Sequence, residues 1–355
     1  MNFKKILIIN PYGIGDVLFT TPVISNLRLA YPQAHIAYLA NRRTADFLKV
    51  NPDINQVFVY ERDEYLKAYR QNPLKFVQKW FSFFNAIRRE KFDAVFDFSL
   101  NSSFGFLPAA CGIKKRVGFD YRKRGRFLTH RVPLVGYEEK HVVEYYLDLL
   151  RAVQIPIKTT QMKLDVPHRD IQWAQEWLES HKIDPAKPLI AVLPGGGASW
   201  GKAAQNKRWA PPNYAHLIDK IIENFDAAII LMGASKEEEL CREVVSLAHF
   251  PLHLAVGETS LLGLAALLLR CQGAIVNDGG PLHVAAAVGT KTVSIFCPVD
   301  PQVYGPYPAA NHTVVQKGLP CQPCYRRFRM SSCSHISCLR DLSVEDVLRK
   351  VQNIL

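Results

Sequence analysis

Near its amino end the chain reads KILIINPYGIGDVLFTTP at residues 5–22. The apolar run at the start of this stretch is typical of a buried strand, and Gly13 and Gly15 then form a tight turn that leads into a helix. Leu18 stands where a dinucleotide-binding G-x-G-x-x-G motif has its third glycine, so the turn lacks the full motif. It instead presents Asp16 at the amino end of a helix, beside the carboxyl edge of the predicted sheet.

The same alternation of strand and helix continues along the chain. Strands that alternate with helices predict parallel sheets built from βαβ units, so we predict an α/β fold. The predicted strands fall at Lys5–Asn10, His35–Leu39, Gln56–Tyr60, Ala94–Phe98, Arg116–Phe119, Leu189–Leu193, Ala227–Met232, His253–Ala255, Gly273–Val276 and Thr292–Phe296.

These strands form two series, and each series opens with a buried strand followed by a glycine-containing turn. We therefore predict an amino-terminal Rossmann-like domain at residues 1–182 and a carboxyl-terminal one at residues 183–340. The linker-like residues 183–188 would join them, and the two domains would face each other across a cleft. A last helix within residues 341–355 follows a loop-rich segment, and we expect it to pack back on the first domain.

Composition narrows the classes of protein to consider. The chain has 355 residues, of which 48% are hydrophobic and 21% charged, the profile of a soluble globular protein. No apolar run approaches the ~20 residues that span a bilayer, and the run at residues 6–9 does not lead into a signal-peptide cleavage site. We therefore expect a cytoplasmic protein. The formal net charge of +12 implies an anionic partner, which could be nucleic acid, an acidic membrane surface or a phosphorylated substrate.

Two loops of the second series have the composition of phosphate-binding sites. Residues 194–209 combine glycines with cations, and Lys207 and Arg208 are the preferred candidates to hold a pyrophosphate. Residues 277–287 place Gly279 and Gly280 before a helix, whose first N–H groups can bind a diphosphate. The alternatives are a plain surface loop and a plain tight turn.

Three side chains near these loops have two interpretations each. Asp278 suits a ribose or sugar hydroxyl better than a phosphate, which it would repel, or it only caps the turn. His283 is either a buried structural histidine or a ligand contact. Glu237 follows a strand, where acidic residues often accept hydrogen bonds from ribose, or it is one of the glutamates that stabilise the first turn of a helix.

Asp16 is likewise either a helix cap or a general base. The chain contains no D-x-D pair of the kind that holds a metal ion for a sugar nucleotide. Helix termini and cations would then have to balance the charge of a leaving group, so no catalytic metal is required.

Together these motifs resemble glycosyltransferase family 9, the ADP-heptose:lipopolysaccharide heptosyltransferases, over nearly the whole chain. The resemblance implies a GT-B fold of two facing Rossmann-like domains. It also implies inverting transfer of heptose from ADP-heptose to the inner core of lipopolysaccharide, without a cofactor. The matching stretches are G-x-G-D-x-L-x-T-T-P at residues 13–22, K-R-W at 207–209, residues 233–237, N-D-x-G-P-x-H-x-A-A at 277–286, and residues 298–306.

The resemblance also implies roles for individual residues. By position, Asp16 corresponds to the catalytic base, Lys207 to the lysine that contacts the nucleotide phosphates, and Glu237 to an acidic nucleotide contact. Asp278 and His283 match the donor-site motif. The departure from the family is Gly279, which stands where Ser or Thr is usual and so removes one hydroxyl that could bind a phosphate.

A basic segment in the first domain is the candidate acceptor site. Residues 114–131 carry eight Lys or Arg side chains against the single Asp120. The segment follows a strand on the same edge as Asp16, so we expect it to bind the phosphates and acidic sugars of an anionic lipopolysaccharide core; a solvated basic loop is the alternative. The residues expected to contact the acceptor are Arg122, Lys123, Arg124 and Arg126.

The helix predicted at residues 74–89 is rich in aromatic side chains and has Lys and Arg at its ends. Most helices of this kind pack against their own sheet. The alternative is peripheral attachment to the cytoplasmic face of the inner membrane.

Four cysteines lie close together near the carboxyl end, in a tail similar to that of the heptosyltransferase II subgroup. Their C-x2-C and C-x4-C spacing could hold a structural zinc ion, although the second pair is wider than in a usual zinc ribbon. Packed or reactive thiols are the alternative. The four residues are Cys321, Cys324, Cys333 and Cys338.

Two other functions remain open from the residues. The charge and the cysteines would suit a nucleic-acid-binding protein, but the basic residues form neither a stacking platform nor a groove-binding helix, so we expect no nucleic-acid partner. Another GT-B nucleotide-sugar enzyme, with a different sugar donor or with epimerase activity, is the second alternative.

Overall fold

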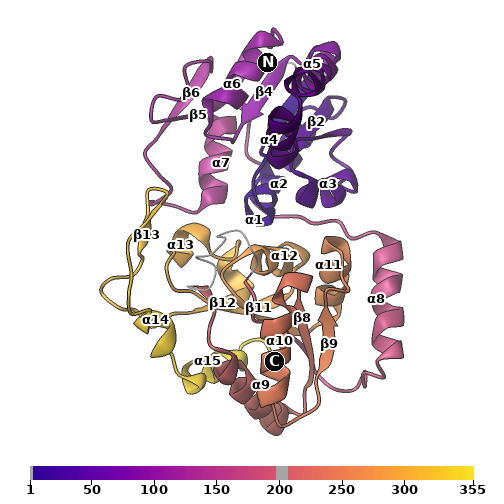
Figure 1. The fold of residues 1–355 in the computed structure, drawn as a ribbon, viewed down its shortest axis with the longest axis vertical. Helices are drawn as coiled ribbons and strands as arrows, with labels where there is room; N and C mark the ends of the chain where they lie inside the picture. Colours follow the sequence, from indigo (N-terminus) through magenta and orange to yellow (C-terminus); the bar gives the residue numbers. More distant parts are fainter. Residues whose placement is uncertain (1–2, 197–206) are drawn as a thin grey trace. The chain divides into compact units, whose positions relative to one another are not determined.

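The computed structural model describes residues 3–196 and 207–355, and the chain forms two compact units (Figure 1). The first comprises Met1–Tyr137 and Val142–Thr160. The second comprises Glu138–His141 and Gln161–Leu355. Each unit contains one six-stranded sheet, in which every pair of neighbouring strands is parallel. The predicted α/β class with two parallel sheets is therefore confirmed.

The sheet of the first unit has the strand order β3-β2-β1-β4-β5-β6. Its central strands are buried along almost their whole length, as expected for a parallel sheet that helices cover on both faces. The strands are β1 (Lys5–Ile9), β2 (His35–Ala40), β3 (Gln56–Val59), β4 (Ala94–Asp97), β5 (Lys115–Tyr121) and β6 (His130–Leu134). The helices are α1 (Ile14–Leu18), α2 (Thr21–Ala30), α3 (Arg42–Lys49), α4 (Arg62–Gln71), α5 (Pro73–Glu90), α6 (Ser102–Ala110) and α7 (Val142–Arg151).

The sheet of the second unit has the order β12-β11-β10-β7-β8-β9. Its strands are β7 (Leu189–Leu193), β8 (Ala228–Gly233), β9 (His253–Val256), β10 (Gly273–Asn277), β11 (Lys291–Ile295) and β12 (His312–Val315). The helices are α8 (His168–Ser180), α9 (Pro211–Phe225), η2 (Ser235–Glu237), α10 (Glu238–Leu247), α11 (Leu261–Arg270), α12 (Gly280–Val288), α13 (Pro301–Tyr304), η3 (Ala309–Asn311), α14 (Ser337–Arg340) and α15 (Val344–Val351). A short hairpin of β13 (Tyr325–Arg326) and β14 (Arg329–Met330) precedes α14.

Counted in chain order within each unit, the two sheets have the same arrangement, 3-2-1-4-5-6. In such a sheet the chain reverses its direction of winding between the first and fourth strands, and ligands bind at the carboxyl ends of these strands. The switch points are thus β1 beside β4 and β7 beside β10, where Ile9 pairs with Asp97 and Leu193 with Val276.

The ten predicted strands are all present, but sequence analysis missed β6 and β12. Both are edge strands, and neither contains the long buried run that marks the central strands. A strand that is only half buried carries a weaker pattern of hydrophobic residues.

The division of the chain differs from the one predicted. The second unit takes in Gln161 onward rather than beginning at residue 183, because α8 packs on α11. Trp173 of α8 lies against Gly263 of α11, and the indole N–H of Trp177 donates to Glu258 at 3.0 Å. Residues 183–188 therefore lie within the second unit.

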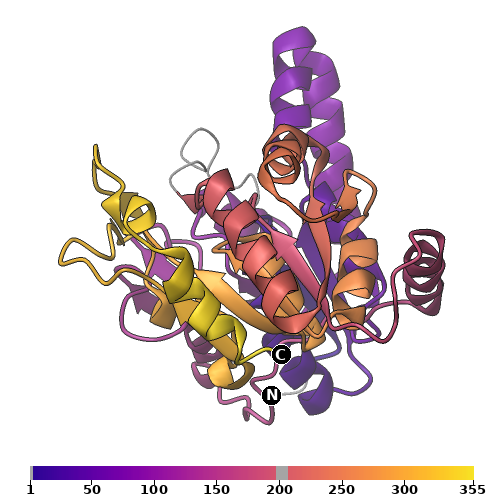
Figure 2. The same ribbon diagram turned by 90° about the horizontal axis from the view of Figure 1, so that it is seen from below.

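The last helix also packs differently from the expectation. Helix α15 contacts α9, β11 and β12 of the second unit, and Figure 2 shows it in yellow alongside α9. The side chains of Val344, Val347, Val351 and Ile354 join the hydrophobic core of that unit. Because four apolar side chains lie on one face of this helix, burial in the core of the second unit determines where it docks.

Candidate active-site residues

Asp16 lies at the switch point of the first sheet, in the first turn of α1, the helix that follows β1. It is half-buried, and its Oδ2 accepts a hydrogen bond from the Gly13 N–H at 3.2 Å. The side chain of Asn10 donates to the Asp16 carbonyl oxygen at 3.0 Å and fixes the turn from the other side. The carboxylate therefore caps the first turn of α1, one of the two roles expected of it.

The charge of Asp16 acts on four tyrosine hydroxyls, and all of them stay protonated near neutral pH. Burial, followed by the charges of Asp97 and Asp16, raises the pKa of Tyr12 to about 12. Burial raises the pKa of Tyr38, Tyr137 and Tyr146 still further, and Asp16 adds to each of these shifts. Because none of these phenols ionises near neutral pH, they cannot act there as general bases, whereas a carboxylate can.

Sequence analysis missed a second carboxylate in this region, that of Asp97. It is the last residue of β4, is only 5% exposed, and accepts a hydrogen bond from the Ser99 N–H at 2.8 Å. Burial raises the pKa of Asp97 to about 6, although hydrogen bonds from Ser99 act in the opposite direction. The signal in the sequence was an acidic residue that ends a buried strand beside β1.

The predicted acceptor residues lie in the loop between β5 and β6. Arg122 and Lys123 adopt left-handed backbone angles, with φ of 51° and 59°, and Asp120 accepts a hydrogen bond from the Gly125 N–H at 2.9 Å. Arg122, Lys123, Arg124 and Arg126 are all exposed. The tight backbone of this loop thus directs four cationic side chains toward solvent.

The charge of this loop reaches the turn that carries Asp16. The guanidinium group of Arg124 acts on Tyr12 and partly offsets the rise in its pKa. Asp16 acts on the same hydroxyl in the opposite direction, so the charges of the predicted base and of one predicted acceptor contact both reach Tyr12. Arg122 and Arg124 also lie over the Tyr121 ring, at 5.0 and 5.7 Å from its centroid.

In the second unit, Lys207 and Asp278 form a buried ion pair next to the amino end of α12. Their side chains are only 8% and 6% exposed. Burial of two charges is costly unless they are paired, so each residue holds the other in place. The two residues are 71 positions apart in the chain. Lys207 precedes α9, and Asp278 directly follows β10.

The amino end of α12 has no room for a side chain at position 279. A Cβ atom at Gly279 would overlap the carbonyl oxygen of Gly196 in the loop after β7. The side chain of Asn277 ties the same two loops together by donating to the Pro194 carbonyl at 2.6 Å. Glycine at position 279, where the family usually has Ser or Thr, is thus explained by the close approach of the two loops.

Arg208 and Glu237 form a second ion pair on this edge of the sheet. Arg208 Nη2 lies 3.5 Å from Glu237 Oε1. The Nε–H of Arg208 donates to the Gly195 carbonyl at 2.7 Å. Glu237 is 6% exposed and accepts a hydrogen bond from the Ala234 N–H at 2.9 Å. Arg208 therefore connects the loop after β7 to the loop after β8. The rest of the predicted glycine-rich loop, residues 197–206, lies outside the described part of the chain.

His283 is buried within α12, at 5% exposure. Burial, followed by the charges of His141, Lys207 and His312, lowers its pKa to about 3. His283 is therefore neutral at physiological pH and contributes no positive charge to a phosphate site.

The structure does not assemble the predicted zinc site. Within residues 3–196 and 207–355, no three His, Cys, Asp or Glu side chains are arranged to hold a metal ion. Cys321 and Cys333 are exposed, whereas Cys338 belongs to the hydrophobic core of the second unit.

The described residues also include no helix with the length and apolar character that crossing a bilayer demands.

Comparisons with known proteins show which family the chain belongs to. The family model for glycosyltransferase family 9 (heptosyltransferase) matches residues 80–335. A lipooligosaccharide heptosyltransferase 2 from Campylobacter jejuni is 24% identical over 357 residues, which covers 99% of this chain and 98% of the relative.

Two solved structures share the fold over almost their whole length. A family 9 glycosyltransferase from Veillonella parvula superposes with a TM-score of 0.81 at 23% identity, covering 99% of this chain and 97% of that one. The ADP-heptose lipopolysaccharide heptosyltransferase II of Escherichia coli gives 0.74 at 22% identity, covering 99% and 98%. The family model spans well over half of the chain, and the chain therefore belongs to glycosyltransferase family 9, the heptosyltransferases.

Proposed function

We propose that this glycosyltransferase moves heptose from ADP-heptose to an inner-core sugar of lipopolysaccharide. Membership of family 9 favours this reaction over nucleic-acid binding and over epimerisation. Curated relatives act in lipopolysaccharide and lipooligosaccharide synthesis, and one E. coli heptosyltransferase was solved with ADP-2-deoxy-2-fluoro heptose. The observation that carries the proposal is the half-buried carboxylate of Asp16 at a switch point, whose charge acts on phenols that stay protonated.

In this mechanism Asp16 removes the proton from an acceptor hydroxyl while the hydroxyl oxygen attacks the anomeric carbon of heptose. The bond between that carbon and the ADP oxygen breaks in the same step, so ADP leaves and the configuration is inverted. The reaction requires the acceptor hydroxyl to lie between Asp16 and the donor sugar. Asp97 is less suited to this role because its carboxylate is almost fully buried.

The second unit is proposed to bind the donor. The first N–H groups of α12 suit the diphosphate, and Lys207 would supply positive charge as negative charge develops on ADP. Glu237 follows β8 next to the switch-point strand β7, where an acidic side chain can accept hydrogen bonds from ribose. Neutral His283 would contribute a hydrogen bond rather than charge.

The first unit is proposed to bind the acceptor. Arg122, Lys123, Arg124 and Arg126 present exposed positive charge on the same sheet edge as Asp16, which suits the phosphates and acidic sugars of the core. Such an acceptor is anchored in a membrane, so we also propose that the enzyme works in the cytoplasm, at the inner face of the inner membrane.

Replacement of the base tests the proposed function. Asp16→Asn keeps an oxygen to accept from Gly13 but cannot take a proton, so turnover should fall by roughly 100-fold or more. Affinity for ADP-heptose, measured by calorimetry, should remain close to that of the wild type. Asp46→Asn, an exposed carboxylate on α3 of the same unit, is the control and should leave both values unchanged. Turnover of Asp16→Asn within about threefold of the wild type would exclude Asp16 as the base.

The donor itself is tested by thermal shift with ADP, UDP, GDP and their sugars. Ligands that bind only the folded chain raise its melting temperature, and at equal concentration the tighter ligand raises it more. ADP-heptose should give the largest increase, and a larger one from a UDP or GDP sugar would exclude ADP-heptose as the donor.

A further inference from the structure

The helical hairpin of α4 and α5 exposes an apolar surface that the proposed chemistry does not use. Contacts between the two helices hold them side by side, as Figures 1 and 2 also show. The inner face of α5 meets the core of the first unit through Ile87, with Trp80, Phe83 and Phe84 packed alongside. The prediction that this helix packs on its own sheet is therefore correct for that face.

A second face of α5 remains uncovered. Leu74, Val77 and Phe81 are 74%, 58% and 60% exposed. Their spacing of three and four residues places them in one stripe along the helix, and the exposed Arg88 lies further along the same side. Tyr69 of α4, which is 58% exposed, contacts Phe76 of α5 edge-on at 5.4 Å and extends the apolar surface across the hairpin.

Positive charge accompanies this apolar surface. Helices α4 and α5, residues 62–90, contain seven Lys or Arg against three acidic residues. Glu64, one of the three, is already paired with Arg42 and Lys79, and the hydrogen bonds from Lys79 and then Arg42 lower its pKa. Glu90 is paired with Lys5. Among the described residues, no ion pair engages the remaining cations of the hairpin: Arg62, Lys67, Arg70, Lys75, Arg88 and Arg89.

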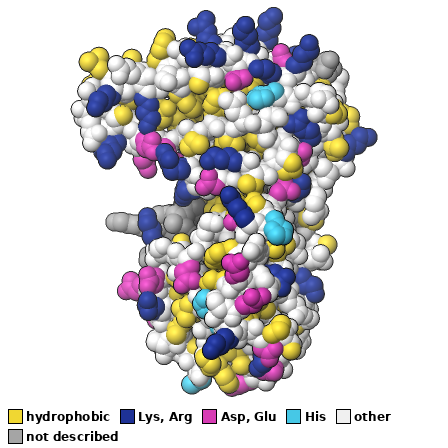
Figure 3. All heavy atoms as spheres, turned by 90° about the vertical axis from the view of Figure 1, so that its right-hand side faces the viewer, with side chains coloured by type: hydrophobic (Ala, Val, Ile, Leu, Met, Phe, Trp, Pro, Cys, Tyr) yellow, Lys and Arg dark blue, Asp and Glu magenta, His cyan; other side chains and the backbone are white. Residues whose placement is uncertain are grey.

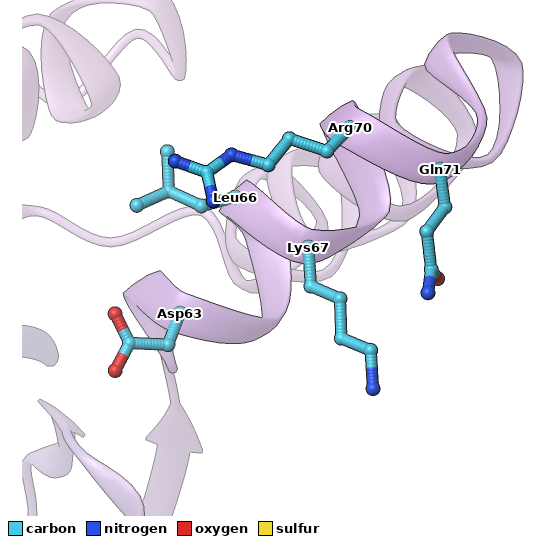
Figure 4. A pocket seen from close by; sticks show the side chains of 5 residues that line it. All are labelled: Asp63, Leu66, Lys67, Arg70 and Gln71. Carbon is cyan, nitrogen blue, oxygen red and sulfur yellow. The ribbon is translucent and has the colours of Figure 1, made fainter.

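An open hollow on α4 adds to this pattern. It has a volume of about 470 Å³ and is lined by Asp63, Leu66, Lys67, Arg70 and Gln71. Figure 4 shows Arg70 extending back along the helix toward Leu66, while Lys67 and Gln71 point to another side. The upper part of Figure 3 shows the same mixture on a wider scale, with hydrophobic side chains at the surface among Lys and Arg.

From this combination we propose that the α4–α5 hairpin docks the protein onto an anionic lipid surface. Helices with an exposed apolar stripe beside Lys and Arg lie in the plane of a membrane interface, where the stripe enters the acyl boundary and the cations meet lipid phosphates. A second copy of the chain fits less well, because a twofold contact would bring the basic hairpins together. The proposal concerns a surface remote in sequence from Asp16 and does not depend on which sugar the enzyme transfers.

Vesicle co-sedimentation of the full chain tests the proposal. Vesicles of phosphatidylglycerol and phosphatidylethanolamine should retain the protein, whereas vesicles of phosphatidylcholine alone should retain at least tenfold less. Each cation near the surface contributes roughly fivefold to the partition coefficient, so binding to the anionic vesicles should weaken as salt screens the charges.

Two sets of variants separate the apolar from the charged contribution. The triple variant Leu74→Ser, Val77→Ser, Phe81→Ser should bind anionic vesicles at least tenfold more weakly than the wild type. Its control is the double variant Leu29→Ser, Val135→Ser, which changes two exposed apolar positions elsewhere in the same unit and should bind like the wild type. The triple variant Lys75→Gln, Arg88→Gln, Arg89→Gln removes half of the unpaired cations, so it should bind more weakly and its binding should depend less steeply on salt. Its control replaces three exposed lysines of the second unit, Lys182, Lys291 and Lys350.

Other outcomes would overturn the proposal. One is that the wild type does not bind anionic vesicles, and another is that the Leu74, Val77, Phe81 triple variant binds them as well as the wild type does. A third is that the wild type is a dimer in sedimentation equilibrium and this triple variant is a monomer. Melting temperatures of the variants should match that of the wild type, since the replaced side chains are exposed. Transfer to a deacylated acceptor in solution should be unchanged in both triple variants, so failure of docking and failure of the proposed reaction are distinguished.

Discussion

Three charged residues near the switch points of this protein are buried. Asp97, Asp278 and Lys207 are each less than 10% exposed, and Asp97 and Asp278 lie at the carboxyl ends of switch-point strands. Burying a charge costs free energy that a surface position would avoid. Such positions are more often functional than structural, and here they coincide with the edges where a nucleotide-binding sheet takes its ligands.

Asp97 predicts a pH dependence of stability. Its pKa is higher in the folded chain, at about 6, than its ordinary value of 3.8, so the folded state holds the proton more tightly. The corresponding stabilisation is present at low pH and is lost as the pH rises from about 4 to 6. Asp97→Asn should therefore be more stable than the wild type at pH 7, by up to roughly 3 kcal/mol.

Urea unfolding at pH 4, 5 and 7 measures this difference, which should shrink toward pH 4 because the pH then approaches the ordinary pKa of 3.8 and the unfolded chain also begins to take up the proton. Asp93→Asn is a poor control because that carboxylate accepts hydrogen bonds from the backbone of Lys4 and Lys5. The exposed Asp46 is a better one. A variant less stable than the wild type at pH 7 would show that burial does not dominate at Asp97.

The Lys207–Asp278 pair predicts non-additive effects. Lys207→Met leaves a buried, uncompensated carboxylate, which should cost about 3 to 5 kcal/mol. Adding Asp278→Asn removes that charge, so the double variant should recover much of the lost stability. Neither variant should regain normal affinity for ADP, because both lack the lysine.

Melting temperatures and ADP calorimetry of the two single variants and the double variant separate the structural role from binding. If the double variant is as unstable as the sum of the single variants, the two charges do not stabilise each other. If Lys207→Met binds ADP normally once corrected for stability, Lys207 is not a phosphate contact.

At the scale of elements, the loops at the carboxyl ends of the strands carry the candidate site residues. The sheets fix where these loops lie. The loops after β7 and β10 are held together by the hydrogen bond from Asn277 to Pro194, and the contact of Gly279 with Gly196 leaves no space for a side chain. In the first unit, the loop after β5 forms a tight turn stabilised by Asp120. Both arrangements orient groups that a flexible loop would leave unordered.

The β5–β6 loop predicts a separation of acceptor from donor binding. Replacing Arg122, Lys123 and Arg124 by Gln should weaken binding of an anionic core acceptor by tenfold or more, because each side chain is exposed and cationic. Binding of ADP-heptose should not change. Measured KM values for the two substrates report both effects, and the acceptor effect should diminish at high salt. Equal weakening of both substrates would contradict the assignment.

At the scale of the whole molecule, two units repeat one strand order, and each places its candidate residues at its own switch point. The carboxyl-terminal helix completes the second unit. Val347 and Val351 of α15 are fully buried in the same core cluster as Trp209, whose indole N–H donates to the Leu342 carbonyl at 3.2 Å. The end of the chain thus supports the segment that carries Lys207.

Removing α15 should destabilise the second unit around the missing helix and leave the first unit unaffected. A chain that ends at residue 343 should lose amide protection in α9, β11 and β12, because these elements contact the missing helix. Strands β1 to β6 of the first unit should keep their protection. Hydrogen exchange read by mass spectrometry measures both regions in one experiment, and equal loss in the first unit would contradict the observed packing. Val347→Ala is a milder version that should show the same pattern.

Much of the architecture followed from local patterns. A buried parallel strand is a short apolar run, and ten such runs alternating with helices predicted two parallel sheets before any contact was known. Turn residues behaved similarly, since Gly13, Asp16, Gly279 and Gly280 follow strands directly and their place at a sheet edge depends only on the chain near them. The edge strands β6 and β12 were not predicted from the sequence, because they are half-buried and lack such an apolar run.

Interactions between distant segments could not be predicted in this way. The pairing of Lys207 with Asp278, the raised pKa of Asp97, the proximity of Arg124 and Asp16 to Tyr12, and the docking of α8 and α15 on the second unit all join residues far apart in sequence. The chain by itself determined which residues form strands, turns and cationic loops, because these depend on periodicity and local composition. Only the tertiary structure decided which charges are buried and which are paired, because desolvation and Coulomb energy depend on the distances between segments that folding brings together.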